Sequence, residues 1–94
     1  MYFQHDKEKD NPMERVRKEG GILPYEHSPG EYRSEYFAGE RERWIVFISM
    51  GGSAVETKHL GPGESWREGS DEFIRSFESK YEAERFAQEY VDSL

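Results

Sequence analysis

Residues 43–60 read RWIVFISMGGSAVETKHL and contain the most apolar run of the chain. Residues 43–50 are β-branched and aromatic and too few for an ordinary helix, which predicts a central strand that is buried on both faces over part of its length. Gly51 and Gly52 tolerate positive φ, so they predict the turn of a hairpin. Residues 53–60 are more polar and predict the returning strand, which should lie nearer an edge.

On the N-terminal side of this hairpin the sequence predicts a third strand and a short helix. Residues 31–38, EYRSEYFA, alternate and are rich in Tyr and Phe, as is typical of a strand. Residues 11–14, NPME, combine a capping side chain, a proline at the first helical position and a glutamate three residues after the cap. Two glycines at 20–21 end this helix. The apolar cluster at 22–25 surrounds a proline and is left without an assigned element.

On the C-terminal side the sequence predicts a loop, a short strand and a final helix. Residues 61–69, GPGESWREG, indicate a flexible loop, and residues 72–77 fit a short strand, although a helical turn fits them too. Ser79 is followed three residues later by Glu82, which is a capping box and starts the helix at Ser79. The apolar residues of this helix recur at helical spacing and form one stripe: Ala83, Phe86, Ala87, Tyr90, Val91 and Leu94.

These elements predict an α+β fold. We expect a flexible tail at residues 1–10 and a single domain at residues 11–94. The domain should hold a small antiparallel sheet of three to four strands, with the C-terminal helix packed on one face and a short N-terminal helix. The predicted core is Tyr36, Trp44, Val46, Ile48, Val55, Phe73, Phe77, Ala83, Phe86, Ala87, Tyr90 and Val91.

Composition excludes several classes of protein. The chain has 94 residues and no cysteine, so it forms no disulfide and no thiolate metal site. No apolar run approaches the roughly 18 residues that cross a bilayer, and the N-terminus lacks the apolar region of a secretory signal. We therefore expect a cytoplasmic protein that does not enter a membrane.

The net charge of −7 is concentrated at one end of the chain. Residues 61–94 hold nine acids and four bases, a net −5, whereas residues 1–30 and 31–60 carry −1 each. An acidic surface repels phosphate backbones and anionic lipids and favours basic partners. The competing explanation is that these acids only keep the protein soluble and bind no partner.

Motifs for catalysis and for cofactor binding are missing from the sequence. The histidines His5, His27 and His59 lack the spacing of metal ligands. Carboxylates are so abundant that neighbouring pairs are inevitable and do not indicate an acid–base pair of an active site. The glycines fit neither a phosphate loop nor a dinucleotide fingerprint, and no serine lies in a nucleophile motif. We expect no catalytic residues, no metal, no cofactor and no enzymatic activity.

One set of residues resembles a family of nucleic-acid-binding domains. Residues 44–60 resemble the second and third strands of a double-stranded RNA-binding domain, and Ser79-Lys80, opening a helix with Ala83 and Ala87, is similar to its final helix. The resemblance implies the order helix, three-stranded meander, helix. The same outline is similar to AP2-like and integrase arm-type DNA-binding domains. Here Tyr81 and Glu82 follow Lys80, where the RNA-binding family has further lysines. Because phosphate binding needs several basic contacts, nucleic-acid binding is the alternative function and nucleic acid is not the expected partner.

The remaining features favour protein binding. Trp66 lies in a polar loop, where it either anchors a partner or folds back onto the core. We predict a non-enzymatic acidic domain that binds a basic protein, with inhibitors that mimic nucleic acid as one subclass. The predicted partner-binding residues are Glu64, Trp66, Glu68, Asp71, Glu72, Glu82 and Glu89. We expect a monomer, or a weak dimer if residues 31–38 or 53–60 form an exposed edge.

Overall fold

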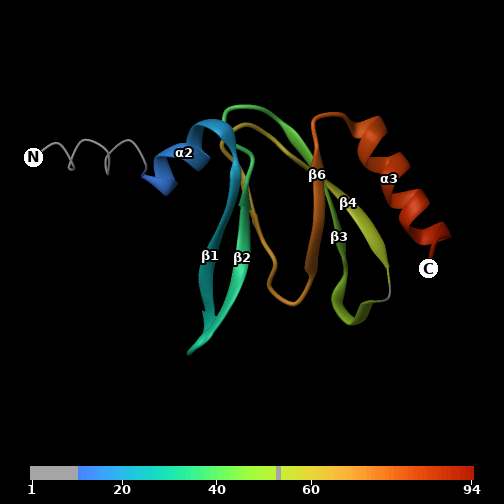
Figure 1. Ribbon diagram of the computed structural model, residues 1–94, viewed down its shortest axis with the longest axis horizontal. Helices are drawn as coiled ribbons and strands as arrows, with labels where there is room; N and C mark the ends of the chain where they lie inside the picture. Colours follow the sequence, from blue (N-terminus) through green and yellow to red (C-terminus); the bar gives the residue numbers. More distant parts are fainter. Residues whose placement is uncertain (1–10, 53) are drawn as a thin grey trace, which may run out of the picture.

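Two three-stranded antiparallel sheets and two helices make up the fold in a computed structural model (Figure 1). The structure describes residues 11–52 and 54–94, so the predicted tail and Ser53 lie outside it. The elements are α2 (Pro12–Glu19), β1 (Gly21–Ser28), β2 (Glu31–Phe37), β3 (Arg43–Ile48), β4 (Val55–Leu60), β5 (Ser65–Arg67), β6 (Glu72–Phe77) and α3 (Lys80–Asp92), with a 3₁₀ turn at Met50–Gly52. The α+β class is confirmed.

The two sheets and α3 form successive layers. The first sheet has the strand order β1-β2-β5, and the second has the order β4-β3-β6. In Figure 1 the second sheet lies between the hairpin of β1 and β2 on one side and α3 on the other. The predicted strands at 31–38, 43–50 and 72–77 are confirmed as β2, β3 and β6. One sheet of three to four strands was expected, whereas the strands divide between two sheets.

Two strands were missed by sequence reasoning. The cluster around Pro24 belongs to β1, which pairs with β2 from Gly21↔Phe37 to Ser28↔Glu31. Pro24 is tolerated because β1 is an edge strand and needs no amide hydrogen at its outer side. The loop at 61–69 contains β5, whose Trp66 pairs with Tyr36. Three residues are too few for a periodic signal, so only pairing in the fold reveals this strand.

The strand order also differs from the resemblance to nucleic-acid-binding domains. A three-stranded meander would place β2 beside β3 in one sheet. Instead, β3 pairs with β4 and β6, while β2 pairs with β1 and β5. The meander implied by the resemblance is therefore absent from the described residues.

The turn of the β3–β4 hairpin is longer than two residues. Gly51 and Gly52 both adopt positive φ, of 82° and 67°, as predicted. They lie in the 3₁₀ turn, and the amide of Ser49 donates to the carbonyl of Ala54 across 2.8 Å to close the loop. The returning strand begins at Val55.

The core lies mainly between the two sheets. Ile45, Val46 and Phe47 are consecutive and all buried, which confirms a strand covered on both faces. Because the first sheet covers the face of the second sheet opposite α3, the core includes residues that the prediction omitted: Ala38, Ile45, Phe47 and Leu60. Val16 of α2 is also buried and was also omitted.

The predicted core residues lie mostly on the α3 side of the second sheet. Tyr36, Val46 and Ala83 are buried, and most of the others are half-buried. Val91 was wrongly assigned to the core, because it lies on the side of α3 and is 46% exposed.

Both helices begin where the sequence predicted. The Asn11 side chain accepts hydrogen bonds from the amides of Met13 and Glu14, at 2.9 and 3.3 Å. The hydroxyl of Ser79 accepts from the amide of Glu82 at 3.2 Å. These side chains satisfy amides that have no partner inside the helix.

Glu78 lies between β6 and α3 and contacts the start of β3 and the β2–β3 connection before it. Its carboxylate contacts Arg43 Nη1 at 2.9 Å and Arg41 Nη1 at 3.4 Å. The hydrogen bond from Arg43 and then the charge of Arg41 lower the pKa of Glu78 below its usual 4.5. Since the folded state favours the charged carboxylate, its contribution to stability is present above the unfolded pKa and is lost as pH falls through the folded pKa.

The free energy of unfolding of the Glu78→Gln variant should therefore depend less on pH in the acidic range. Between about pH 5 and pH 3, urea unfolding should show the stability of the unmodified protein falling more steeply than that of the variant. Parallel pH profiles for the two proteins would contradict this role of Glu78.

Candidate functional site

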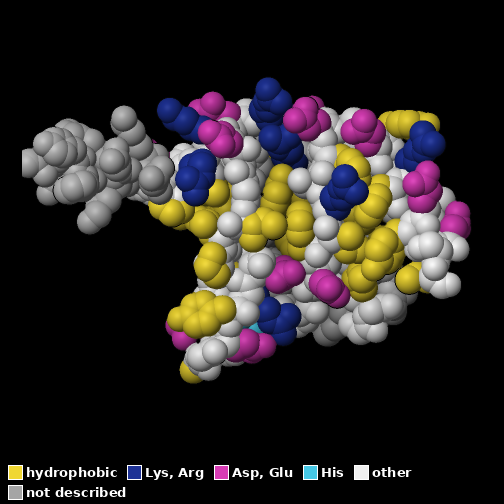
Figure 2. All heavy atoms as spheres, in the orientation of Figure 1, with side chains coloured by type: hydrophobic (Ala, Val, Ile, Leu, Met, Phe, Trp, Pro, Cys, Tyr) yellow, Lys and Arg dark blue, Asp and Glu magenta, His cyan; other side chains and the backbone are white. Residues whose placement is uncertain are grey.

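The surface along β6 combines half-buried aromatic rings with exposed acids. Figure 2 shows apolar side chains gathered across the middle of the molecule, where β6 lies in Figure 1, with charged side chains around them. We call this surface the β6 face and define it by residues of β6 and of the adjoining side of α3: Glu72, Arg75, Phe77, Glu82, Phe86, Glu89 and Tyr90.

The aromatic rings of the β6 face form a row from β6 into α3. The ring centroids of Phe77 and Phe86 are 5.3 Å apart, and those of Phe86 and Tyr90 are 6.0 Å apart. The guanidinium of Arg75 lies 5.5 Å from the Phe77 centroid and 5.6 Å from that of Phe86. Aromatic faces attract cations through their quadrupole, and these two rings already hold one.

Three acids predicted from the sequence lie on the β6 face. Glu82, Phe86 and Glu89 follow the spacing i, i+4, i+7, so the two acids lie along the helical stripe that holds Phe86. Glu72 pairs with Ile48 in the sheet, which places its side chain on the face that α3 covers. All three glutamates are exposed.

The acids lie at two levels of this face. Glu82 lies in the first turn of α3. Val91 lines a hollow together with Val55, and Val55, Ile48 and Glu72 form one row across the sheet. The C-terminal half of α3, with Glu89, is therefore at the level of Glu72, and the aromatic row has acids near both ends.

Glu68 has a structural position. One carboxylate oxygen accepts from the amide of Ser34 in β2 at 3.0 Å, and the other accepts from the amide of Phe73 in β6 at 2.9 Å. Its own amide donates to the Ser34 carbonyl at 3.0 Å. Glu68 thus links the two sheets, and both of its carboxylate oxygens are engaged within the protein.

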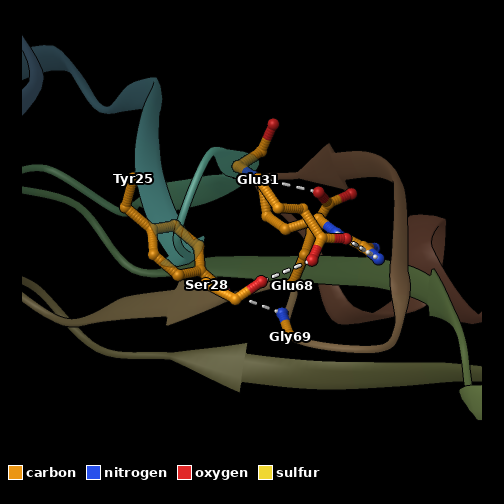
Figure 3. A network of polar contacts seen from close by, with 7 residues as sticks. Tyr25, Ser28, Glu31, Glu68 and Gly69 are labelled. Atoms are coloured by element: carbon orange, nitrogen blue, oxygen red, sulfur yellow. Dashed lines mark hydrogen bonds and ion pairs between the residues drawn. The ribbon is translucent and has the colours of Figure 1, made fainter.

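The same segment is anchored to β1 (Figure 3). The amide of Gly69 donates to the hydroxyl of Tyr25 at 2.9 Å, and Arg67 lies 4.5 Å above the Tyr25 ring. Further along the hairpin, the Ser28 hydroxyl donates to Glu31 at 2.6 Å. The contacts of Gly69 and Arg67 with Tyr25 hold this segment, which the sequence predicted as a loop, against β1 of the first sheet.

Trp66 folds back onto the core. It is half-buried, and its ring centroid lies 5.0 Å from that of Phe47 and 6.3 Å from that of Phe73. Of the two roles left open for Trp66, the packed one matches the structure. Its residue type gave no means of choosing, because the packing partners come from β3 and β6.

The other predicted acids are not gathered with the β6 face. Glu64 follows the Phe37 end of β2, where its carboxylate accepts from the amide of Gly61 at 2.6 Å. Glu64 is thus separated from Glu72 of the β6 face, which lies opposite Ile48 at the end of β3. Asp71 is half-buried in the turn before β6, and its amide donates to the Glu68 carbonyl at 2.7 Å.

Residues that sequence reasoning missed carry the centre of the β6 face. Phe77, Phe86 and Tyr90 were predicted only as core, and Arg75 was given no role. The spacing of Arg75 and Phe77 was a signal that the two share a face of the strand, whereas the bulge opposite Val46 and Phe47 turns Phe73 toward Tyr36 and Trp66 of the first sheet. Which helix would face them was not contained in that pattern.

Surface hollows elsewhere are small. One of about 380 Å³ is lined by Lys18, Glu19, Glu40, Arg41 and Arg43. Another, of about 230 Å³, lies between α3 and β4. Within residues 11–52 and 54–94 no group of three or more His, Asp or Glu side chains could hold a metal ion. No helix in that part of the chain is long and apolar enough to cross a membrane.

Comparisons with known protein families, with curated proteins and with solved structures gave no significant match. The function is therefore argued from the geometry of the β6 face.

Proposed function

We propose that this protein is a non-enzymatic binding domain whose β6 face receives a basic segment of a partner protein. The observation that carries the proposal is the position of Arg75 over Phe77 and Phe86. A guanidinium already rests on these rings, and Arg or Lys side chains of a partner would make the same kind of contact on the neighbouring ring of Tyr90.

Acids beside the rings supply the charge that such a partner requires. Glu82 and Glu72 have no ion pair among the described residues, and Glu89 is paired with Arg85 across 3.1 Å on the exposed helix surface. An exposed pair of this kind is weak, so Glu89 remains available to an incoming cation. Half-buried aromatic rings bordered by charged residues are a common composition for protein interfaces.

The finer form of the proposal is an inhibitor that occupies a nucleic-acid-binding site. Carboxylates of the β6 face would take the place of phosphates on the basic partner. The net −5 of residues 61–94 supports this form, because it extends the negative field around the site. Binding of such a partner should then compete with duplex nucleic acid.

The test is affinity capture with a matched pair of variants. The site variant carries Gln at Glu72, Glu82 and Glu89. The control carries Gln at Glu14, Glu19 and Glu40, which are exposed. Glu14 and Glu19 belong to α2 and Glu40 lines a hollow with Glu19, and α2 is distant from α3 in Figure 1. Proteins retained from lysate at low salt by the unmodified chain and the control, but not by the site variant, are then purified and their affinities are measured by calorimetry.

Removing the three carboxylates should weaken binding about tenfold, because each exposed charge contributes roughly 0.2–1 kcal/mol. The affinity of the unmodified chain should also fall as salt rises. An affinity that does not change with salt, or equal losses in the site and control variants, would contradict the proposal.

Nucleic-acid binding remains the alternative and has a simple test. The strand order does not provide the meander of the look-alike families, and acids lie among the bases around the hollow of α2. A gel shift with duplex RNA or DNA at low salt, at tens of micromolar protein, would favour this alternative over the first proposal.

A further inference from the structure

β4 presents a regular strand edge. It forms one edge of the second sheet and pairs with β3 over six residues without a register shift. The other edges are interrupted: β1 contains Pro24, β5 has three residues, and β6 has a bulge opposite Val46 and Phe47 and a Phe73 amide held by Glu68. Among the described strands, β4 is thus the edge best suited to pair with another strand.

The register of the β3–β4 hairpin determines which backbone groups point outward. Ser49 and Ala54 continue this register and are joined by a hydrogen bond from Ser49 N to Ala54 O. Bonded and non-bonded pairs alternate along an antiparallel ladder. The residues of β4 that bond to β3 are therefore Glu56, Lys58 and Leu60. The residues whose amide and carbonyl groups point out of the sheet are Val55, Thr57 and His59.

We propose that β4 pairs with the β4 strand of a second copy of this chain, antiparallel, about a twofold axis at Thr57. The two three-stranded sheets then form one sheet of six strands. In this register Thr57 exchanges two hydrogen bonds with the partner's Thr57. Val55 forms its outward bonds with the partner's His59, and His59 forms its outward bonds with the partner's Val55. Every outward amide and carbonyl of these three residues gains a bond.

Charge favours this register over the two adjacent symmetric registers. With the axis at Thr57, Glu56 lies directly opposite the partner's Lys58, and the contact occurs twice by symmetry. An axis at Glu56 or at Lys58 would instead place two like charges opposite each other, which disfavours pairing. Both side chains are exposed, and neither has an ion pair among the described residues. The edge is therefore self-complementary in one register.

A contact between helices adds to the strand pairing. The hollow of about 230 Å³ lies beside the proposed axis, and Val55 and Thr57 form its floor. Its wall is the side of α3 that carries Glu84, Gln88 and the half-exposed Val91. The same side of the partner's α3 would face this hollow across the axis. The interface remains small, so we expect a dissociation constant between about 10 µM and 1 mM.

Charge exchange at two positions tests the register. Sedimentation equilibrium from about 10 µM to 2 mM should show that Glu56→Lys or Lys58→Glu alone weakens the dimer at least about tenfold, because each places like charges opposite each other. The double variant restores both pairs and should dimerise within about threefold of the unmodified chain. Glu40→Lys, on the β2–β3 turn, makes the same change of net charge as Glu56→Lys and should leave the dimer intact.

Three results would overturn the proposal. They are a chain that stays monomeric to 2 mM, single variants no weaker than the Glu40→Lys control, and a double variant that fails to recover.

Hydrogen exchange provides a readout at the level of single amides. The amides of Val55, Thr57 and His59 should exchange more slowly as protein concentration rises through the dimer range, because pairing covers them. The amides of Glu56 and Lys58 are already bonded to β3 and should change little. Exchange at the three outward amides that is independent of concentration would contradict pairing at this edge. The β4 edge is opposite the β6 face in the sheet, so this test is independent of the binding proposal.

Discussion

Replacing Gly39 by Ala is expected to lower the midpoint of thermal unfolding by at least about 8 °C, which corresponds to about 2 kcal/mol or more for a domain of this size. Gly39 follows β2, adopts φ of +82° and is buried. A Cβ there would lie 2.9 Å from both the Glu19 carbonyl carbon and the Lys18 carbonyl oxygen, and it would also meet the amide nitrogen of Gly20. All three atoms belong to the backbone, so relief requires α2 to move away from the first sheet.

Gly63→Ala is the matched control. Gly63 has the same φ of +82°, but a Cβ there meets nothing within 4 Å. It therefore isolates the cost of the left-handed conformation, about 1–2 kcal/mol. Thermal unfolding followed by circular dichroism should show a clearly larger loss for Gly39→Ala. Equal losses in the two variants would show that the close crossing of the two backbone segments contributes nothing.

Replacing Glu68 by Ala should reduce the free energy of unfolding by about 2–4 kcal/mol. The substitution removes the acceptor of two amides, those of Ser34 and Phe73, that bridge the two sheets. A buried donor left without a partner costs about 1–3 kcal/mol, and charged acceptors make the stronger bonds. Urea unfolding measures the loss, and faster hydrogen exchange at these two amides locates it.

Two further variants define the cause of that loss. Glu68→Gln keeps one acceptor oxygen, so its free energy of unfolding should lie between that of the unmodified protein and that of Glu68→Ala. Glu72→Ala removes a nearby exposed carboxylate without a hydrogen bond among the described residues, and it should change stability by no more than about 0.5 kcal/mol. If both alanine variants lose the same stability, the bridge between the sheets is not the source.

Glu68 and Trp66 show how the candidate site changed between sequence and structure. Both stood in a segment that was acidic, glycine-rich and without periodicity, so both were predicted as partner-binding residues of a loop, with packing on the core left open for Trp66. Trp66 packs on Phe47 and Phe73, and Glu68 bonds to Ser34 and Phe73. Each partner is distant in sequence or follows a turn, so no local pattern could reveal the contact. Glu72, Glu82 and Glu89 remain exposed and stay in the proposed site.

Local rules were sufficient for many elements of this protein. The capping side chains of Asn11 and Ser79 began both helices as predicted, because a cap acts on amides within three residues of itself. The alternation and apolar content of β2, β3 and β6 identified them as strands. The positive φ of Gly51 and Gly52 followed from their lack of a side chain.

The sequence by itself determined the α+β class, the helix starts, four strands and the concentration of negative charge in residues 61–94, because each depends on neighbours along the chain. Tertiary structure alone decided the division into two sheets, the inclusion of Ile45 and Phe47 in the core, and the meeting of Arg75 with Phe86. These features depend on which strand lies beside which and on which layer covers each face. Packing between segments distant in the chain sets both, and a pattern of period two or 3.6 carries no information about it.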